Sequence, residues 1–245
     1  MAKLLSIQDK ILIGLAIIGD VFDDVRTVGG YRGWAYQIAY GFTPEKYKKE
    51  NFLSRVSKML SSDLIEKVIE KGEVKFRVSS TGKNKLTRNF PLLAIQNKPW
   101  DKKWRVLTFD IPQIEKYKRD SLRRKLKAFG FGMVQQSVWI SPHSFEDDIN
   151  DFVKENNLEN YVCLFVSNKM LIGEGADFVE KVWHVNDLNK FYEEVYNTND
   201  LENYMELISF DPYLPKEFLP KPWFGDTARE KFKKLALQKS DTAVL

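Results

Sequence analysis

The sequence predicts an α+β protein built from several domains, and three observations lead to this prediction. The 245 residues, 43% of them hydrophobic, are enough for one large or two to three small cores, at roughly 100–200 residues per domain. Helical and strand-like hydrophobic periods alternate along the chain. The segment from Asn89 to Asp101, with Pro91 and Pro99, is typical of a linker. We therefore expect domains at residues 1–90, 100–170 and 173–245.

Residues 1–90 begin with a helical pattern. Apolar residues spaced along one helix face from Ile7 to Phe22 predict a first helix, and residues Trp34 to Tyr40 predict a second. Thr43 and Pro44 form a helix start signal, with Thr as the cap and Pro at the first helical position. They predict a third helix that continues to Leu60.

A hairpin pattern follows the third helix. Two short apolar strands flank a glycine-containing turn at Glu70–Glu73, and a short helix near Thr81–Leu86 closes the unit. Three helices followed by a hairpin are the order of a winged helix-turn-helix domain, in which the third helix enters the DNA major groove and the hairpin lies against phosphates. The predicted DNA contacts are Lys46, Tyr47, Lys48, Lys49, Asn51, Ser54, Arg55 and Lys58 on the helix and Lys71, Lys75 and Arg77 on the hairpin. A winged helix that serves protein contacts or dimerisation is the alternative.

Charge is distributed unevenly along the chain, although the net charge is only +4. Residues 46–88 hold 12 Lys and Arg against 5 Asp and Glu, and residues 98–127 hold 11 against 4, so each block carries +7. Residues 144–206 hold 4 against 15, a balance of −11. The two basic blocks favour contact with a polyanion, whereas the plain alternative is a set of solvated helix faces.

The central segment predicts a sheet covered by two helices. A strand ending at Asp110 precedes a helix at Lys116–Phe129, whose inward side should carry Tyr117, Leu122, Leu126 and Phe129. A glycine turn leads into β structure up to Pro142, and a second helix and a strand at Tyr161–Val166 follow. This β-α-β-β-α-β order predicts a ferredoxin-like domain.

The motifs of this central segment resemble those of a known family. Residues 103–142 contain W-R-x-x-x-F-D-I-P, R-D-x-L-R-R-x-L and G-F-G-x-x-Q-x-S-V-W-I-S-P, and with them the segment closely resembles the central domain of the PaaX family of bacterial transcriptional repressors. Residues 182–188 and 211–235 resemble that family's C-terminal helical domain.

The resemblance implies a dimeric, DNA-binding repressor. The best-known members control phenylacetate catabolism and release DNA on binding phenylacetyl-coenzyme A, so an acyl-coenzyme A is the effector class that the resemblance implies. Family members usually carry arginines in the groove helix, whereas this chain has Lys48 and Lys49 and a longer helix to Leu60. Because lysine cannot make arginine's bidentate contact with guanine, the operator sequence and the ligand stay open.

The central domain also resembles the small ferredoxin-fold CRISPR-associated nuclease of the adaptation machinery. In that family the residue matching Asp110 pairs with its twin across a dimer, where two carboxylates hold a Mg²⁺ ion that activates water. The alternative function is therefore a metal-dependent nuclease with Asp110 as its catalytic and metal-binding residue. The simpler interpretation of Asp110 is a turn residue that hydrogen-bonds local backbone N–H groups.

The remaining candidates predict no further chemistry. The basic row Lys116, Lys118, Arg119, Arg123, Arg124 and Lys127 is interpreted as an effector site, a secondary nucleic-acid contact or a contact with an acidic partner subunit. His143 and His184 lie too far apart for a zinc motif, and Cys163 is expected to be an inert thiol in the core. We expect no cofactor, no resident metal and no membrane-spanning helix, and the single cysteine favours the cytoplasm.

Overall fold

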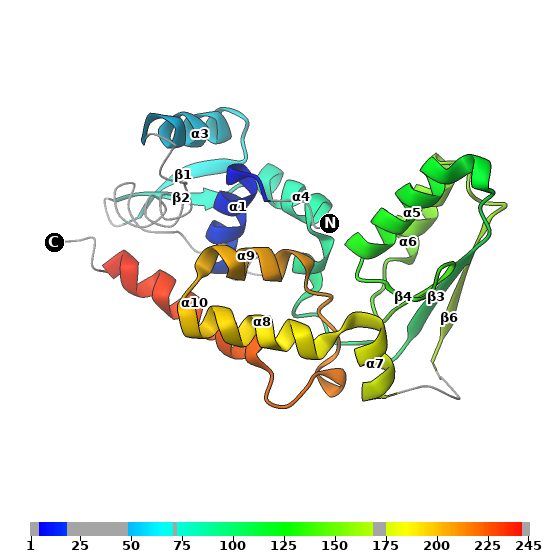
Figure 1. The fold of residues 1–245 in the computed structure, drawn as a ribbon. Coiled ribbons are helices and arrows are strands. Elements are labelled where there is room, and N and C mark those ends of the chain that lie inside the picture. The colour runs from blue at the N-terminus through cyan, green and yellow to red at the C-terminus, as the bar shows by residue number, and fades with distance from the viewer. Residues whose placement is uncertain (1–4, 19–48, 71–72, 169–174, 242–245) are drawn as a thin grey trace. The chain divides into compact units, whose positions relative to one another are not determined.

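A computed structural model describes residues 5–18, 49–70, 73–168 and 175–241, with the backbone alone at residues 7, 17–18, 49–53, 68–70, 73–75 and 236–241. Helices occur together with two antiparallel sheets, which confirms the expected mixture of α and β structure (Figure 1). The predicted helix at Trp34–Tyr40 and the predicted start of the third helix at Thr43 lie outside the described residues.

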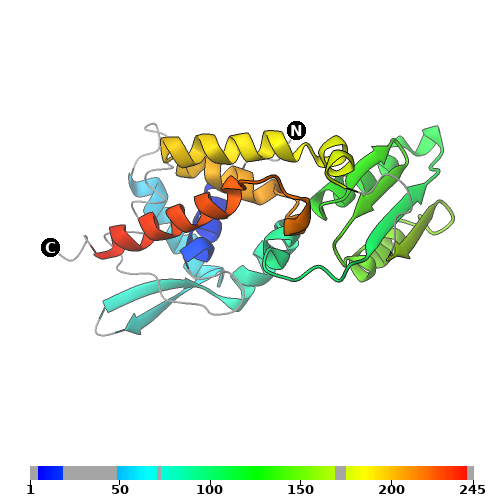
Figure 2. The ribbon, with the colours of Figure 1, turned by 90° about the horizontal axis from the view of Figure 1, so that it is seen from below.

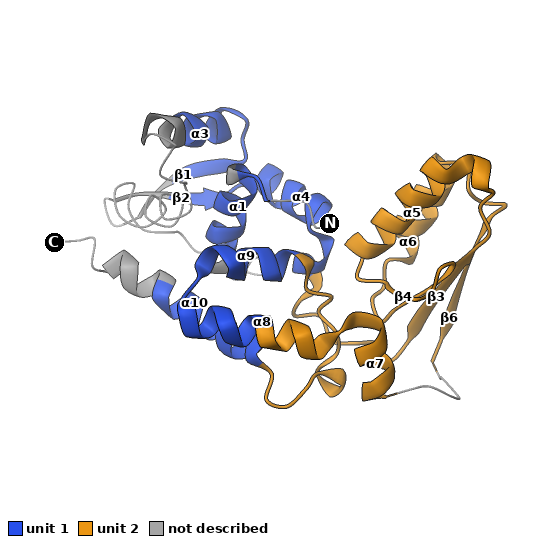
Figure 3. Ribbon diagram, viewed as in Figure 1, with its two compact units in different colours: residues 1–94, 191–209, 224–245 blue, residues 95–190, 210–223 orange. Residues whose placement is uncertain are grey.

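The chain forms two compact units, shown in blue and orange in Figure 3. Unit 1 comprises residues 1–94, 191–209 and 224–245, and unit 2 comprises residues 95–190 and 210–223. Helix α8 (Val185–Thr198) contributes to both units. These units do not follow the predicted boundary near residue 170, and the division into three domains stays a prediction.

Unit 1 begins with helix α1 (Ile7–Ile18), which starts at a side-chain cap. The Ser6 hydroxyl donates to Oδ2 of Asp9 at 2.7 Å, and the Asp9 backbone N–H donates back to that hydroxyl at 3.2 Å. The two bonds satisfy polar groups at the helix start that would otherwise lack partners. Leu12 and Ile13 on α1 are buried, and the helix packs beside α4, α10 and strand β2.

Helix α3 (Lys49–Ser61) leads into the hairpin of strands β1 (Ile65–Glu70) and β2 (Glu73–Val78). Helix α4 (Ser80–Asn89) follows, so the predicted order of helix, hairpin and helix is present over residues 49–89. The 3₁₀ helix η1 (Pro91–Ile95) buries Pro91, Leu92 and Leu93. The predicted linker therefore begins as part of the core, because its three apolar residues pack instead of facing water.

The C-terminal helices of unit 1 are α9 (Leu201–Phe210) and α10 (Phe224–Asp241). They pack through Tyr204 and Phe232, whose rings are stacked with centroids 4.3 Å apart and are both almost fully buried. Tyr192 on α8 lies edge-on to Tyr204 at 6.4 Å. An aromatic cluster thus joins the three C-terminal helices within this unit.

Unit 2 contains a four-stranded sheet with the predicted β-α-β-β-α-β order (Figure 2). Its elements are β3 (Trp104–Phe109), α5 (Lys116–Ala128), β4 (Gly132–Gln135), β5 (Val138–Ser141), α6 (Glu146–Glu155) and β6 (Val162–Ser167). The strands lie in the antiparallel order β4-β5-β3-β6. This is the strand order of the ferredoxin-like arrangement, with the first strand central.

The two faces of this sheet have different covers. Leu107 and Trp139 pair across the sheet and are buried, on the face where Leu122 and Leu126 of α5 and Ile149 of α6 supply the opposing core residues. On the other face, Trp104 and Ile140 form a core with α7 (Ala176–Trp183) and with residues of the 210–223 segment, namely Leu214 and Phe218.

Two expectations for this unit are wrong. Tyr117 is 79% exposed, because it lies five residues before Leu122 and a helix turns about 100° per residue, which places it away from the inward stripe. Cys163 is exposed and not in the core. It lies on β6 at the edge of the sheet, where Phe165 on the same face is also 55% exposed.

Candidate nucleic-acid interface

The exposed side of α3 carries the predicted groove residues that the structure describes with their side chains. Ser54, Arg55 and Lys58 are exposed, while Val56 and Met59 are buried against the rest of unit 1. Among the described residues, neither Arg55 nor Lys58 has an ion-pair partner. Lys49 and Asn51 belong to α3, but only their backbone is described. Lys46, Tyr47 and Lys48 lie outside the described residues. The described part of the helix thus offers two unpaired cations to water.

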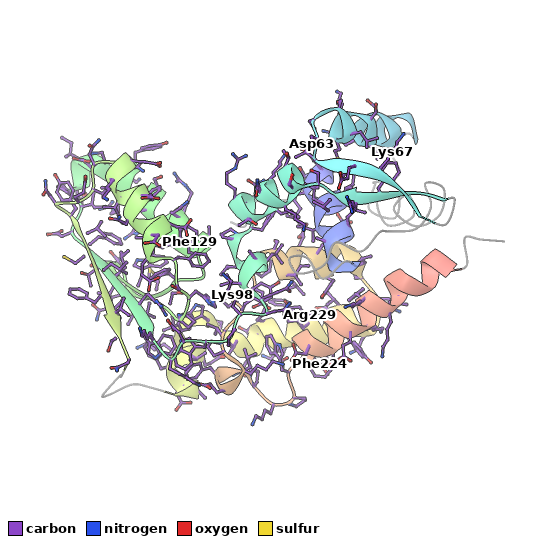
Figure 4. The ribbon with its side chains drawn as sticks, turned by 180° about the vertical axis from the view of Figure 1, so that it is seen from behind. Asp63, Lys67, Lys98, Phe129, Phe224 and Arg229 are labelled. Carbon is purple, nitrogen blue, oxygen red and sulfur yellow. The ribbon has the colours of Figure 1, made fainter. Side chains whose placement is uncertain are left out.

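A hydrogen-bond network fixes the hairpin relative to α3 and α4. The Leu64 N–H donates to the carbonyl of Met59 at 2.9 Å, and Thr81 Oγ1 donates to a carboxylate oxygen of Asp63 at 2.7 Å. Ser79 caps α4 by accepting from the Gly82 N–H at 3.0 Å. A Cβ atom at Gly82 would lie 2.1 Å from the carbonyl oxygen of Leu64, so only glycine allows this close approach. Figure 4 labels Asp63 at this junction.

The hairpin presents its cations differently from the expectation. Arg77 is half-buried and forms an ion pair with Glu66, its cross-strand neighbour. Lys75 lies on β2 and Lys71 lies outside the described residues. Lys67 on β1 is exposed (Figure 4) and was not among the predicted contacts. Lys67 lies two residues after the buried Ile65 on the same strand.

The basic row on α5 contains cations with partners inside the protein and cations without an ion-pair partner among the described residues. Lys118 pairs with Glu115 at 2.6 Å, and Arg123 donates to the carbonyl of Gln136 at 3.1 Å while its guanidinium lies 5.8 Å from the ring centre of Phe109. The cations without an ion-pair partner among the described residues are exposed: Lys116, Arg124 and Lys127. Arg119 is half-buried, with its Nε atom unpaired.

Asp110 lies at the end of β3, where its carboxylate is exposed. Its backbone N–H donates to the carbonyl of Tyr161 at 2.9 Å. Within the described residues its carboxylate accepts no hydrogen bond, so the expected turn-stabilising bond is not formed there. The described residues also contain no group of three or more His, Cys, Asp or Glu side chains able to hold a metal ion.

Comparison with known proteins identifies the family. Residues 97–179 match the model described as PaaX protein central Cas2-like domain, and residues 183–244 match that of the PaaX-like protein C-terminal domain. The chain belongs to the PaaX family. Over 159 residues it is 24% identical to the Transcriptional repressor PaaX of Escherichia coli (strain K12). This alignment covers 54% of this chain and 50% of that protein. The chain therefore aligns with about half the length of this curated relative.

A solved structure shares the fold of this PaaX-family chain. The uncharacterized protein Rv0674 from Mycobacterium tuberculosis superposes with a TM-score of 0.55 at 16% sequence identity, over 82% of this chain and 86% of that one. Among the residues that the structure describes, no helix is long and apolar enough to cross a membrane.

A buried ion network in the PaaX-like central region was missed by the sequence interpretation. Arg105, 3% exposed, donates to both carboxylate oxygens of Asp101 at 2.7 and 2.6 Å and to Glu146 at 2.7 Å. The hydrogen bond from Arg105 lowers the pKa of Asp101. Burial raises the pKa of Glu146, but hydrogen bonds from Ser144 and Arg105 outweigh burial and the net pKa is lowered. The sequence feature that could have indicated this network is Arg105 itself, a charged residue inside the apolar strand β3.

The two histidines have structural places. His143 lies between β5 and α6, with Nε2 2.6 Å from the carbonyl oxygen of Pro212, and burial lowers its pKa to about 4. His184 ends α7 in the left-handed conformation, with φ of 52°. The two residues thus lie at separate positions, His143 in the loop before α6 and His184 at the end of α7.

Proposed function

We propose that this PaaX-family chain is a DNA-binding transcriptional repressor that places α3 in the major groove and the β1–β2 hairpin against the backbone. The observation that carries the proposal is the sequence of helix, hairpin and helix at residues 49–89, with Arg55, Lys58 and Lys67 exposed. The E. coli relative, named a transcriptional repressor, supports the same function. The cytoplasm is the compartment in which this function would be carried out.

The proposed contacts fall into two classes. Exposed side chains on α3 would reach base edges and phosphates, because a helix fits the major groove and its outward residues meet the bases. Cations on the hairpin would neutralise phosphates without reading sequence. Arg77 would contribute less than predicted, since its charge is already balanced by Glu66. Lys67 takes its place among the proposed phosphate contacts.

The proposal includes a homodimer and an acyl-coenzyme A effector, both drawn from the family resemblance. Repressors of this kind bind two half-sites, so a dimer matches a two-fold symmetric operator. An effector would release DNA by binding the non-DNA conformation more tightly, typically with 1–3 kcal/mol of coupling. The basic row on α5 is a candidate for the effector's phosphates or for a secondary nucleic-acid contact.

A gel titration against the DNA upstream of the chain's own gene tests the function. The protein is titrated at two salt concentrations, with Mg²⁺ and with EDTA, and shift and cleavage are followed in the same lanes. A specific, salt-sensitive shift of intact DNA is the expected result. Mg²⁺-dependent cleavage without a specific shift would instead support the nuclease, with Asp110 as its metal ligand and catalytic residue.

A further inference from the structure

We infer that the C-terminal helices α9 and α10 complete the part of unit 1 that binds DNA, and that the ion pair of Lys10 with Glu202 positions them there. Lys10 lies on α1 and Glu202 lies on α9, 192 positions later in the chain. Neither residue is among the proposed DNA contacts. The two form a positioning pair, which acts on DNA through the placement of α3 and the hairpin. The inference rests on the proposed function for the site that the pair positions.

Helix α1 is buried on all sides over two of its turns. Residues 9–16 are all buried, and these eight consecutive residues cover more than two turns at 3.6 residues per turn. A helix at the surface of a domain normally keeps a polar stripe in water. Other elements of unit 1 therefore cover α1 from every direction along this stretch.

The cover of α1 comes from both ends of the chain. Strand β2 and helix α4 pack against it from the region of the proposed winged helix, and α10 packs against it from the C-terminal region. The Lys10 ammonium donates to the Glu202 carboxylate, so α9 reaches the same helix (Figure 1). Tyr204 of α9 and Phe232 of α10 stack on each other. The core around α1 is therefore incomplete without α9 and α10.

The two partners of the ion pair differ in their burial. The side chain of Lys10 is 10% exposed, whereas that of Glu202 is 46% exposed. Burial of an ammonium group is unfavourable unless an anion and hydrogen bonds compensate for the lost water. Within the described part of the chain, Lys10 has no other ion-pair partner. Loss of Glu202 would therefore leave a buried charge unpaired, whereas loss of Lys10 would leave a carboxylate that water can reach.

Hydrogen bonds connect the position of α1 to that of α3. The Lys85 ammonium on α4 donates to Oε1 of Gln8 on α1 at 2.9 Å. The start of α4 is bonded to the turn between α3 and β1, where the Thr81 hydroxyl donates to Asp63 at 2.7 Å. Helix α1 also packs directly against β2 of the hairpin. A displacement of α1 would therefore displace the elements that are proposed to touch DNA.

The positioning pair connects the C-terminal domain of the family to DNA binding. Residues 183–244 match the model of the PaaX-like C-terminal domain, and both α9 and α10 lie within this range. This domain would therefore contribute to the affinity for DNA without touching it.

DNA affinities of full-chain variants test the inference. The matched control is Glu206→Gln on the same helix, because Glu206 forms no ion pair among the described residues. Glu202→Gln should bind the upstream DNA about tenfold or more weakly, because the unpaired Lys10 separates α9 from α1. Lys10→Met together with Glu202→Gln should restore the affinity to within about threefold, because the buried charge is then absent. Affinities are measured well below each unfolding temperature, and stoichiometric titration gives the binding-competent fraction.

Hydrogen exchange of the free protein separates this inference from the proposed function. In Glu202→Gln the amides of α1, α3 and the hairpin should exchange faster than in the natural chain, while those of β3 and β5 in unit 2 should not change. Faster exchange of α3 in a chain that binds no DNA would contradict the proposed function alone. Specific DNA binding by the natural chain that Glu202→Gln leaves unchanged would contradict the positioning pair alone.

Two further results would overturn the inference. The first is exchange of the α3 amides in Glu202→Gln at the rate of the Glu206→Gln control. The second is a double variant, Lys10→Met with Glu202→Gln, that binds DNA as weakly as Glu202→Gln. If Glu202→Gln does not fold, the double variant decides: a folded protein with the natural affinity supports the pair, and an unfolded one overturns it.

Discussion

The imidazole Nε2 of His143 lies 2.6 Å from the carbonyl oxygen of Pro212, although the two residues are 69 positions apart in the chain. A carbonyl oxygen only accepts hydrogen bonds, so Nε2 carries the proton and donates. The bond ties the loop before α6 to the 210–223 segment within unit 2. Because burial holds the pKa of His143 at about 4, the bond is made by a neutral histidine at neutral pH.

The first prediction is a loss of stability in mild acid. The pKa of His143 is about 4 when folded and 6.5 by its ordinary value, so the unfolded chain binds this proton more readily. The free energy of unfolding should therefore fall as pH drops from 6.5 towards 4, by up to roughly 3 kcal/mol. Urea unfolding measured across this range checks the slope.

His143→Gln is the matched control for this slope. Its side-chain amide can still donate to Pro212 but does not titrate, so the pH dependence above pH 4.5 should become flatter. The lowered pKa values of Asp101 and Glu146 affect stability in a more acidic range. Their contribution to the free energy of unfolding is lost only as pH falls below their ordinary pKa values of 3.8 and 4.5. An unchanged slope in the glutamine variant would show that His143 is not the group responsible.

The second prediction concerns the ion network of Arg105. Arg105→Met leaves Asp101 and Glu146 without their cation and should destabilise the fold by about 3 kcal/mol. Lys102→Met removes the exposed ion pair of Lys102 with Glu217, 2.6 Å long, and should cost less than about 1 kcal/mol. Equal unfolding midpoints for the two variants in guanidinium chloride would contradict this ranking.

The third prediction tests the contact of α7 with β4. A Cβ atom at Gly132 would lie 2.1 Å from Cγ1 of Val182 and 2.6 Å from the Trp183 ring. Gly132→Ala should therefore force α7 away from the sheet and cost about 1–3 kcal/mol. Met133→Ala, at the 49% exposed neighbouring position, should have little effect. Thermal unfolding of both variants, together with near-UV circular dichroism of the tryptophans, provides the comparison.

The fourth prediction separates DNA binding from nuclease chemistry. Asp110→Ala should leave the affinity for upstream DNA unchanged, because the residue lies at the end of β3 in unit 2, outside the proposed α3 and hairpin contacts. Incubation with Mg²⁺ should show equal, background-level cleavage for the natural chain and the variant. A cleavage activity that Asp110→Ala abolishes would contradict this prediction and support the metal-dependent nuclease.

Much of the fold could be predicted from local signals. The hairpin followed from two apolar strands around Gly72, and the glycine turn after Phe129 marked the passage from α5 to β4. The pairing of Glu66 with Arg77 could also have been derived, since pairing Glu70 with Glu73 fixes the register of the two strands. The candidate site on α3 followed from helical spacing and charge.

The exposure of Cys163 and the burial of Arg105 depend on distant parts of the chain, whereas the error at Tyr117 was one of local helical spacing. The alternation of residues along β6 could not show that Cys163 and Phe165 stay exposed to solvent. Whether this side of the strand is buried depends on packing by residues far away in the sequence. The burial of Arg105 depends on Glu146, 41 positions away. The sharing of C-terminal helices between two compact units likewise follows from packing, which local patterns do not record.

The salt dependence of DNA binding tests the central claim most directly. Log K is measured against log salt concentration for the natural chain, for the triple variant Lys48→Ala, Lys49→Ala and Arg55→Ala, and for Lys154→Ala on α6 as a control. If α3 is the groove helix, the triple variant should bind weakly and with a slope flatter by about 2 to 3, at roughly 0.9 per phosphate contact. The control should match the natural chain. A triple variant with the natural affinity and slope would contradict the assignment of α3 to DNA.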